Sequence, residues 1–314
     1  MPEKGFFNQR AERRDQHGER LDFGLKKMSQ KVNEEFFFQI GANLLLEDGS
    51  LNMYAFQKKK KDGPFRKTRK VDDPTDTGEG SIENDKEFVR GLDLDRAYEE
   101  VGVSNTVALG VTSPERFLEL YEKKRLEKSG IKLEMVLTLL LHKVLGKDFL
   151  VVRSSAFDDN KNGVDHLVID RRTGNVVCTF DEVNDEADGD RMAKKNKKIQ
   201  STAQKGGSSI KYGLTFTGPE NDKKIERGQL DNVPLFALAL SSSELDVLLG
   251  GMDFDPESPC DTIELQFFAK LMQALQDQQA AIAESPVPKG VKNRLEEFKV
   301  SFARMRELGQ IKSK

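Results

Sequence analysis

Apolar and polar positions divide the centre of the chain into one long helical segment followed by short extended ones. Residues 131–145 (IKLEMVLTLLLHKVL) carry the apolar positions of a buried helix, and residues 149–153 form a short apolar run typical of a strand. Two β-rich segments follow at residues 165–170 and 176–183, separated by a short turn that contains Thr and Gly. This spacing predicts a β-hairpin.

A polar helix and a buried strand are predicted after the hairpin, at residues 188–205 and 234–240 (PLFALAL). Helices and strands in this order predict an α/β fold with a mixed sheet. The glycine-rich residues 206–209 lie between them, and a plain turn is favoured over a phosphate-contacting loop because no strand-loop-helix phosphate motif surrounds it. Lys211 and Tyr212 follow directly and are candidate contacts for a nucleic-acid substrate.

Composition divides the chain into four regions. Residues 1–31 are highly charged with little periodicity and are expected to form a poorly ordered arm. Residues 32–112 form an N-terminal region, in which a lysine run, prolines and glycines predict a linker or long loop near residues 58–85. Ser113 and Pro114 then supply an N-cap and a first-turn proline for the helix that opens the core, residues 113–250.

The last region, residues 251–314, is expected to form a C-terminal helical hairpin. Residues 262–284 and 291–308 both repeat apolar positions at helical spacing. Such stripes either pack on each other or on the core, or they form a homodimer interface.

Acidic residues lie where the two strands of the hairpin meet. Asp165 opens the first strand, and Asp181 and Glu182 close the second. Antiparallel pairing brings these ends to roughly 5 Å from each other. Carboxylates at that spacing can share Mg²⁺ or Mn²⁺, which is the minimum for metal-assisted hydrolysis of a phosphodiester.

The acids and the order of the elements around them resemble the PD-(D/E)XK, or restriction-endonuclease-like, nuclease superfamily. Its core is a helix, a three-stranded meander, a helix and a strand, and the similar part of this chain spans about residues 113–250. The resemblance implies a metal-dependent nuclease in which Asp165 and Asp181 bind the metal and Glu134 on the first helix assists. Glu182 is the alternative ligand, because side-chain alternation does not decide between it and Asp181.

The chain departs from the superfamily pattern at Val183, which stands where the superfamily has a catalytic Lys. The next helix offers a replacement in Lys194, Lys195 and Lys198, which lie close together at 100° per residue, and Lys197 is a candidate nucleic-acid contact. A solvated charge run explains the same lysines. The alternative function is therefore a catalytically inactive nuclease-like domain that binds nucleic acid or a protein partner.

Residues 158–163 (DDNKNG) offer a competing metal site because they match the start of a calcium-binding loop. Such a loop needs a Glu at its twelfth position, and that position is Ile169 here. A polar turn that leads into the strand explains the same residues and is favoured.

Composition constrains the partner and the compartment. With a formal net charge of -3, the chain is not a uniformly basic nucleic-acid binder, so binding would depend on local basic patches such as residues 58–61, 66–70 and 194–198. DNA is favoured over RNA as the substrate. The two cysteines form no CxxC pair. The chain has no run of roughly 20 apolar residues and no signal-peptide apolar segment, so a cytoplasmic location without membrane insertion is expected.

Overall fold

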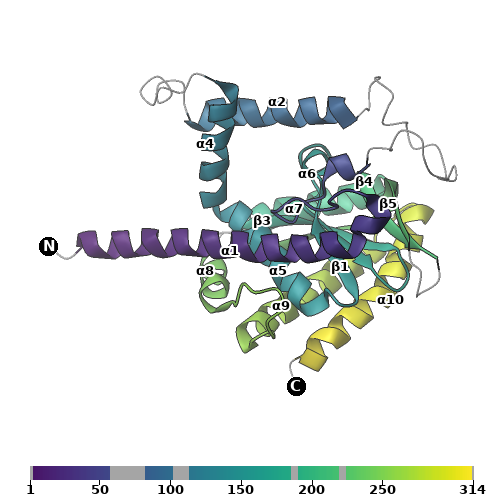
Figure 1. Cartoon of the computed structure of the whole chain (residues 1–314). Helices are drawn as coiled ribbons and strands as arrows, with labels where there is room; N and C mark the ends of the chain where they lie inside the picture. The colour runs from purple at the N-terminus through teal and green to yellow at the C-terminus, as the bar shows by residue number, and fades with distance from the viewer. Residues whose placement is uncertain (1–2, 57–81, 102–112, 185–189, 219–223, 313–314) are drawn as a thin grey trace.

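A computed structural model describes residues 3–56, 82–101, 113–184, 190–218 and 224–312. Within these ranges, a four-stranded sheet has the order β1-β2-β3-β6. The strands are β1 (Phe149–Arg153), β2 (His166–Asp170), β3 (Val176–Asn184) and β6 (Leu235–Leu240). β1, β2 and β3 form an antiparallel meander, and β6 pairs with β3 in parallel. The predicted α/β class and the mixed sheet are therefore confirmed (Figure 1).

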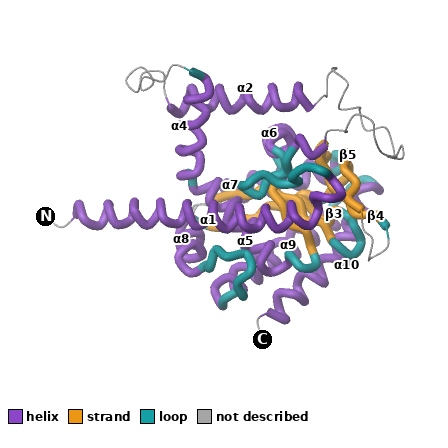
Figure 2. Tube along the Cα trace, in the orientation of Figure 1, coloured by secondary structure: helices purple, strands orange, loops and turns teal. Residues whose placement is uncertain are grey.

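Helices cover both faces of this sheet (Figure 2). On one face, α5 (Ser129–Leu145) contributes Thr138 against His166 of β2, and α10 (Lys289–Lys312) packs Phe298 on Phe236 of β6 with ring centroids 4.7 Å apart. On the other face, α7 (Asp190–Gln204) contacts Asp181 of β3 through its lysines. Because both faces are covered, the strands are almost continuously apolar rather than alternating.

The order α5, β1, β2, β3, α7, β6 agrees with the order that the hydrophobic pattern predicts. Two predicted caps are present as well. The Ser113 hydroxyl accepts from the backbone N–H of Arg116 at the start of α4 (Pro114–Glu127), and Ser241 forms a capping box with Glu244 at the start of α8 (Ser242–Gly251). These side chains satisfy N–H groups that have no partner within the helix.

The N-terminal segment differs from the expected unstructured arm. Helix α1 (Glu3–Ile40) is continuous, and its C-terminal half packs on α5. A stripe spaced by three or four residues is buried there: Leu21, Leu25, Met28, Val32, Phe36 and Ile40. Charged residues separate the apolar ones, so average composition hides the stripe that fixes the helix to the core.

Further elements surround the sheet. A second, two-stranded sheet consists of β4 (Ser208–Thr217) and β5 (Lys224–Val233), and the sequence pattern does not predict it. A short helix, α6 (Ala156–Asn162), stands where a polar turn is expected. The remaining elements are η1 (Met53–Phe56) and α2 (Ile82–Val101).

The turn between β2 and β3 joins the two sheets. The backbone carbonyl of Gly174 accepts from the N–H of Phe216 on β4 at 2.9 Å, and a Cβ at Gly174 would lie only 1.8 Å from the carbonyl oxygen of Phe216. Gly174 also has a φ of 77°, in the left-handed region that glycine adopts without strain.

The C-terminal helices α9 (Thr262–Ala283) and α10 form part of the main core. Leu271, Leu275 and Phe298 are buried within the chain itself, so their apolar stripes are used internally. The predicted homodimer through these helices stays a prediction. No helix in the described ranges has the length and hydropathy of a bilayer-crossing segment.

A buried ion pair fixes α9 to α5. The Lys143 ammonium and the Glu264 carboxylate are in contact, and both side chains have no exposed surface. The same ammonium donates to the backbone carbonyl of Asp253 at 2.8 Å, and Glu264 also accepts from the N–H of Asp261 at 2.7 Å. These bonds satisfy two charges that would otherwise be buried alone.

Removing one partner of this pair should destabilise the protein strongly. We expect Lys143→Met to lower the free energy of unfolding by about 3–5 kcal/mol, because it leaves the Glu264 charge buried without compensation. The matched control is Lys270→Met on the same helix as Glu264, which removes a half-exposed pair with Glu244 and should cost at most about 1 kcal/mol. Urea unfolding measures the free energy of unfolding of both variants. Equal losses of stability in the two variants would contradict the assignment of Lys143 and Glu264 as a buried ion pair.

Candidate functional site

Polar side chains gather at one end of the main sheet. In the antiparallel register, Arg153 at the end of β1 lies opposite His166 at the start of β2, and His166 lies opposite Phe180 near the end of β3. Asp165, Asp181 and Glu182 therefore lie at this same end of the sheet. The register brings together residues that are up to 29 positions apart in the chain.

Asp165 and Glu182 are the two acids that meet most closely. The backbone N–H of Glu182 donates to Oδ2 of Asp165 at 2.6 Å, which holds the two residues side by side. Burial and the neighbouring Glu182 carboxylate raise the pKa of Asp165 well above its ordinary value. Burial also raises the pKa of Glu182 to about 8, and Glu134 and Asp181 add to that effect. Without a cation, this pair of carboxyl groups retains a proton near neutral pH.

The Glu182 carboxyl group is buried beside the carboxyl group of Asp165 and the His166 ring. Its side chain is 1% exposed, and neither Oε1 nor Oε2 accepts a hydrogen bond from an N–H group or an alcohol of the described residues. Nδ1 of His166 lies 2.6 Å from Oε1, and the carboxyl groups of Asp165 and Glu182 share a hydrogen bond. Two charged carboxylates buried side by side are costly, so either a proton or a cation is needed to keep this pair together.

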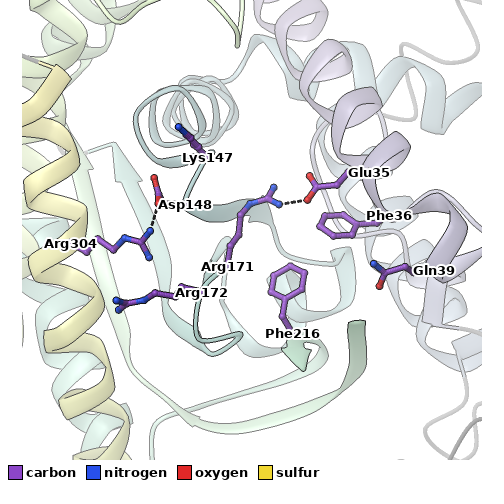
Figure 3. Close-up of a pocket in the computed structure, with 9 residues that line it drawn as sticks. All are labelled: Glu35, Phe36, Gln39, Lys147, Asp148, Arg171, Arg172, Phe216 and Arg304. Carbon is purple, nitrogen blue, oxygen red and sulfur yellow. Dashed lines mark hydrogen bonds and ion pairs between the residues drawn. The ribbon is translucent and has the colours of Figure 1, made fainter. Parts of the chain in front are cut away.

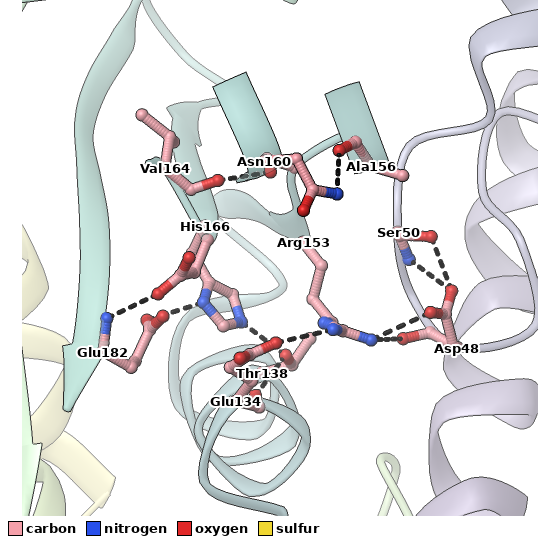
Figure 4. A network of polar contacts seen from close by, with 12 residues as sticks. Asp48, Ser50, Glu134, Thr138, Arg153, Ala156, Asn160, Val164, His166 and Glu182 are labelled. Carbon is pink, nitrogen blue, oxygen red and sulfur yellow. Dashed lines mark hydrogen bonds and ion pairs between the residues drawn. The ribbon is translucent and has the colours of Figure 1, made fainter. Parts of the chain in front are cut away.

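His166 is held in one orientation by α5 (Figure 4). The Thr138 hydroxyl donates to the backbone carbonyl of Glu134 at 2.7 Å and lies 2.5 Å from Nε2 of His166. Because its proton is used on Glu134, that hydroxyl accepts from Nε2–H. Burial lowers the pKa of His166 to about 4, so the imidazole is neutral at pH 7 and its Nδ1 lone pair faces Glu182.

Arg153 supplies the positive charge on this face of the sheet. Its guanidinium donates to Oε2 of Glu134 at 2.6 Å and to Oδ2 of Asp48 at 2.9 Å (Figure 4). Burial alone would lower the pKa of Arg153, but Asp48 and Glu134 more than offset this and raise it. Glu134, predicted to assist at the site, is therefore placed beside it by a buried arginine that the sequence pattern does not single out.

Asp181 lies on the opposite face of β3 from Glu182. Its carboxylate contacts the ammonium of Lys195 and lies 3.0 Å from that of Lys198. The preference for Asp181 over Glu182 as the partner of Asp165 therefore changes: Glu182 is the carboxylate beside Asp165, and Asp181 is an ion-pair partner of α7. The reason is the alternation of side chains along a strand, combined with a lysine-bearing helix that packs on the Asp181 face.

The four lysines of α7 do not act as one group. Lys195 and Lys198 reach the sheet, and Nζ of Lys198 also lies close to Gly163, 2.7 Å from where a Cβ of that residue would be. Lys194 and Lys197 are exposed, and no ion pair joins either of them to a described carboxylate. Two lysines of this helix thus contact Asp181, and among the described residues no lysine forms an ion pair with Asp165 or Glu182.

Asp158 is a structural residue and no calcium ligand. Both of its carboxylate oxygens accept hydrogen bonds, Oδ1 from Asn162 and from the N–H of Lys211, and Oδ2 from Ser155 and from the N–H of Tyr212. These bonds fix α6 to β4 and leave the carboxylate fully buried. The calcium-loop alternative is inconsistent with this arrangement, since the segment is helical and its first acid is already satisfied.

Asp159, the next residue, belongs to the candidate site although the sequence pattern does not indicate it. Its carboxyl group interacts with that of Asp165, and burial raises its pKa while Arg153, Arg125 and Arg96 act in the opposite direction. The last two come from α4 and α2. A polar turn in the sequence gives no sign that one of two adjacent acids faces a strand end.

Lys211 and Tyr212 are not placed as surface contacts for nucleic acid. Tyr212 is 2% exposed, and its hydroxyl donates to Oδ2 of Asp85 on α2 at 2.6 Å. The ammonium of Lys211 lies 2.6 Å from the same oxygen. Both residues therefore attach α2 to β4, and the prediction that they contact a substrate is replaced by this structural role.

The described residues offer few protein ligands for a divalent cation. No three His, Cys, Asp or Glu side chains in the described ranges converge with the geometry of a metal site. Asp165 and Glu182 nevertheless provide adjacent buried carboxyl groups that share a hydrogen bond. Mg²⁺ commonly binds through one or two carboxylates and keeps several waters, so this pair is compatible with it.

Removing the Glu182 charge should stabilise the protein at high pH. The pKa of Glu182 rises from 4.5 to about 8 on folding. Between those values folding takes up a proton, so the free energy of unfolding falls as the pH rises, by at most about 1.4 kcal/mol per pH unit. Glu182→Gln avoids this loss. Its free energy of unfolding should therefore exceed that of the wild type by an amount that grows from pH 5 to pH 8. Denaturant unfolding across this pH range measures the free-energy difference, and Glu284→Gln at an exposed position is the control. A difference between Glu182→Gln and the wild type that does not change with pH would contradict the prediction.

Comparisons with known proteins give no relative from which a function could be transferred. No protein-family model matches the chain, and neither a curated protein nor a solved structure is significantly similar to it.

Proposed function

We propose that this protein is a metal-dependent nuclease of the PD-(D/E)XK type. The observation that carries the proposal is the contact between Asp165 and Glu182 at the end of a meander, where two buried carboxyl groups lie close enough to share a hydrogen bond. The element order α5, β1, β2, β3, α7, β6 supports it, because it is the order of that superfamily's core.

The proposed ligands are Asp165 and Glu182, with Glu134 and Asp159 nearby. Mg²⁺ or Mn²⁺ bound there would polarise a phosphate oxygen and lower the pKa of a bound water. The cation would also replace the proton that the two carboxyl groups retain, which removes the cost of keeping them together. His166 and Arg153 are positioning residues in this arrangement, since they hold Glu182 and Glu134 rather than a substrate.

The lysine of the superfamily pattern is proposed to come from α7. The Lys198 side chain is 48% exposed and its ammonium lies near Gly163, two residues before Asp165. An ammonium there is available to contact the scissile phosphate as a point charge. Lys195 is more buried and remains close to Asp181, which supports a role in holding α7 on the sheet.

A second candidate function is a nuclease-like domain that binds without cutting. Val183 stands at the usual lysine position, and counting from Glu182 instead places Asn184 there, which is also not a lysine. Lys195 and Lys198 both form ion pairs with Asp181. Such a domain would bind nucleic acid or a protein partner, with DNA favoured over RNA in the first case.

Cleavage tests the first proposal. Purified protein with Mg²⁺ or Mn²⁺ should cleave DNA, and RNA tested in parallel shows whether DNA is preferred. Asp165→Asn should reduce the rate by at least roughly 100-fold, because the ligand is lost while the shape is kept. The matched control is Asp246→Asn, an exposed acid on α8. Activity that persists in Asp165→Asn would reject the assignment.

Metal binding separates the two functions. Calorimetric titration with Mn²⁺ should show binding to the wild type and to Asp246→Asn, and weakening of at least about tenfold in Glu182→Gln, since one carboxylate ligand is lost. Asp181→Asn should bind the metal like the wild type because its carboxylate faces α7. Metal binding without cleavage would favour the catalytically inactive nuclease-like domain. A greater loss of metal affinity in Asp181→Asn than in Glu182→Gln would overturn the assignment of Asp165 and Glu182 as the ligands.

A further inference from the structure

A basic pocket lies at the end of the sheet opposite the candidate site. Along β1 the two ends are about 13 Å apart, at roughly 3.3 Å per residue. The pocket has a volume of about 330 Å³ and is bounded by α1, the end of α5, the β2–β3 turn, β4 and α10 (Figure 3). Its polar lining consists of Glu35, Gln39, Lys147, Asp148, Arg171, Arg172 and Arg304.

Positive charges outnumber negative ones in this pocket. Lys147, Arg171, Arg172 and Arg304 line it together with only two acids, Glu35 and Asp148. Figure 3 shows how the acids are used: Arg171 pairs with Glu35, and Arg304 pairs with Asp148. The lining has 4 cations and 2 anions on a concave surface, and the buried carboxylate of Asp170, 3.6 Å from the Arg304 guanidinium, lowers the local formal charge from +2 to +1. Such a surface concentrates field lines and favours an anion.

The turn that carries Arg171 and Arg172 is fixed in place. Asp170 is fully buried, and its Oδ1 accepts from the backbone N–H groups of Arg172 at 2.8 Å and Thr173 at 3.3 Å. Its Oδ2 accepts from the Ser301 hydroxyl on α10 at 2.9 Å. The two arginines thus start from a rigid backbone, so less conformational entropy is lost when they bind a ligand.

Aromatic side chains form the apolar wall of the pocket. The rings of Phe36 and Phe216 lie 5.6 Å apart, and the guanidinium of Arg171 lies 5.6 Å from the Phe36 ring centre. An apolar wall behind a guanidinium reduces its solvation and strengthens its attraction for an anion. Guanidinium groups also match the oxygen geometry of phosphate better than that of a monovalent halide.

We propose that this pocket binds a small phosphate-bearing ligand, a phosphomonoester or inorganic phosphate, through Lys147, Arg171, Arg172 and Arg304. The phosphate dianion would offset the excess positive charge, and the volume is sufficient for a phosphate with a small substituent. This site is separate from the carboxylate pair, and the inference does not rest on the proposed nuclease activity.

Thermal unfolding of the full chain with inorganic phosphate tests the proposal. Phosphate should raise the melting temperature in a saturable way, whereas sodium chloride at matched ionic strength should not. In the double variant Lys147→Gln/Arg172→Gln, the half-saturating phosphate concentration should rise at least tenfold. Both residues are exposed, so the variant is expected to fold, and its melting temperature in chloride alone verifies this.

Further ligands distinguish the sources of the phosphate. Thymidine monophosphate should raise the melting temperature of the wild type, and thymidine should not. A larger shift with the nucleotide than with inorganic phosphate identifies a phosphomonoester as the ligand. The matched control is Lys292→Gln, an exposed lysine on α10 outside the pocket lining, which should respond like the wild type. The proposal is overturned if neither phosphate nor the nucleotide gives a saturable shift, if the double variant responds like the wild type, or if only long DNA stabilises the protein.

Discussion

Pairing of β2 with β3 determines where Asp165, His166 and Glu182 of the candidate site lie. The strands are antiparallel and buried on both faces, so a shift of one residue would move each buried side chain to the wrong face. In the observed register, the N–H of Glu182 reaches the carboxylate of Asp165. The acids, His166 and the end of β1 are brought together as a consequence of this hairpin and of the helices that cover it.

Much of the α/β core follows from patterns in the sequence. The long apolar run of α5, the short apolar strands and the caps at Ser113 and Ser241 are local signals, and each predicts its element without knowledge of the rest. The stripe of α1 and the β4–β5 hairpin are different. Their apolar residues are separated by charged ones or alternate weakly, so these elements are stabilised by packing on a core that already exists.

The candidate site could be predicted only in part. Asp165 and the approach of α7 lysines follow from position in the chain, whereas the choice between Asp181 and Glu182 depends on which helix covers which face of β3. Arg153 and Asp159 have no sequence signal, because their roles arise from contacts with Glu134 and Asp165 across distant segments. The buried pair of carboxyl groups formed by Asp165 and Glu182 is likewise a tertiary property.

The contact between Gly174 and Phe216 makes the two sheets mechanically continuous. Only backbone atoms meet there, and no side chain separates the hairpin turn from β4. A displacement of β4 is therefore transmitted to β2 and β3 without a compressible layer between them. The close approach of the two sheets requires a glycine at position 174, because the Cβ of any other residue would push the turn and β4 apart.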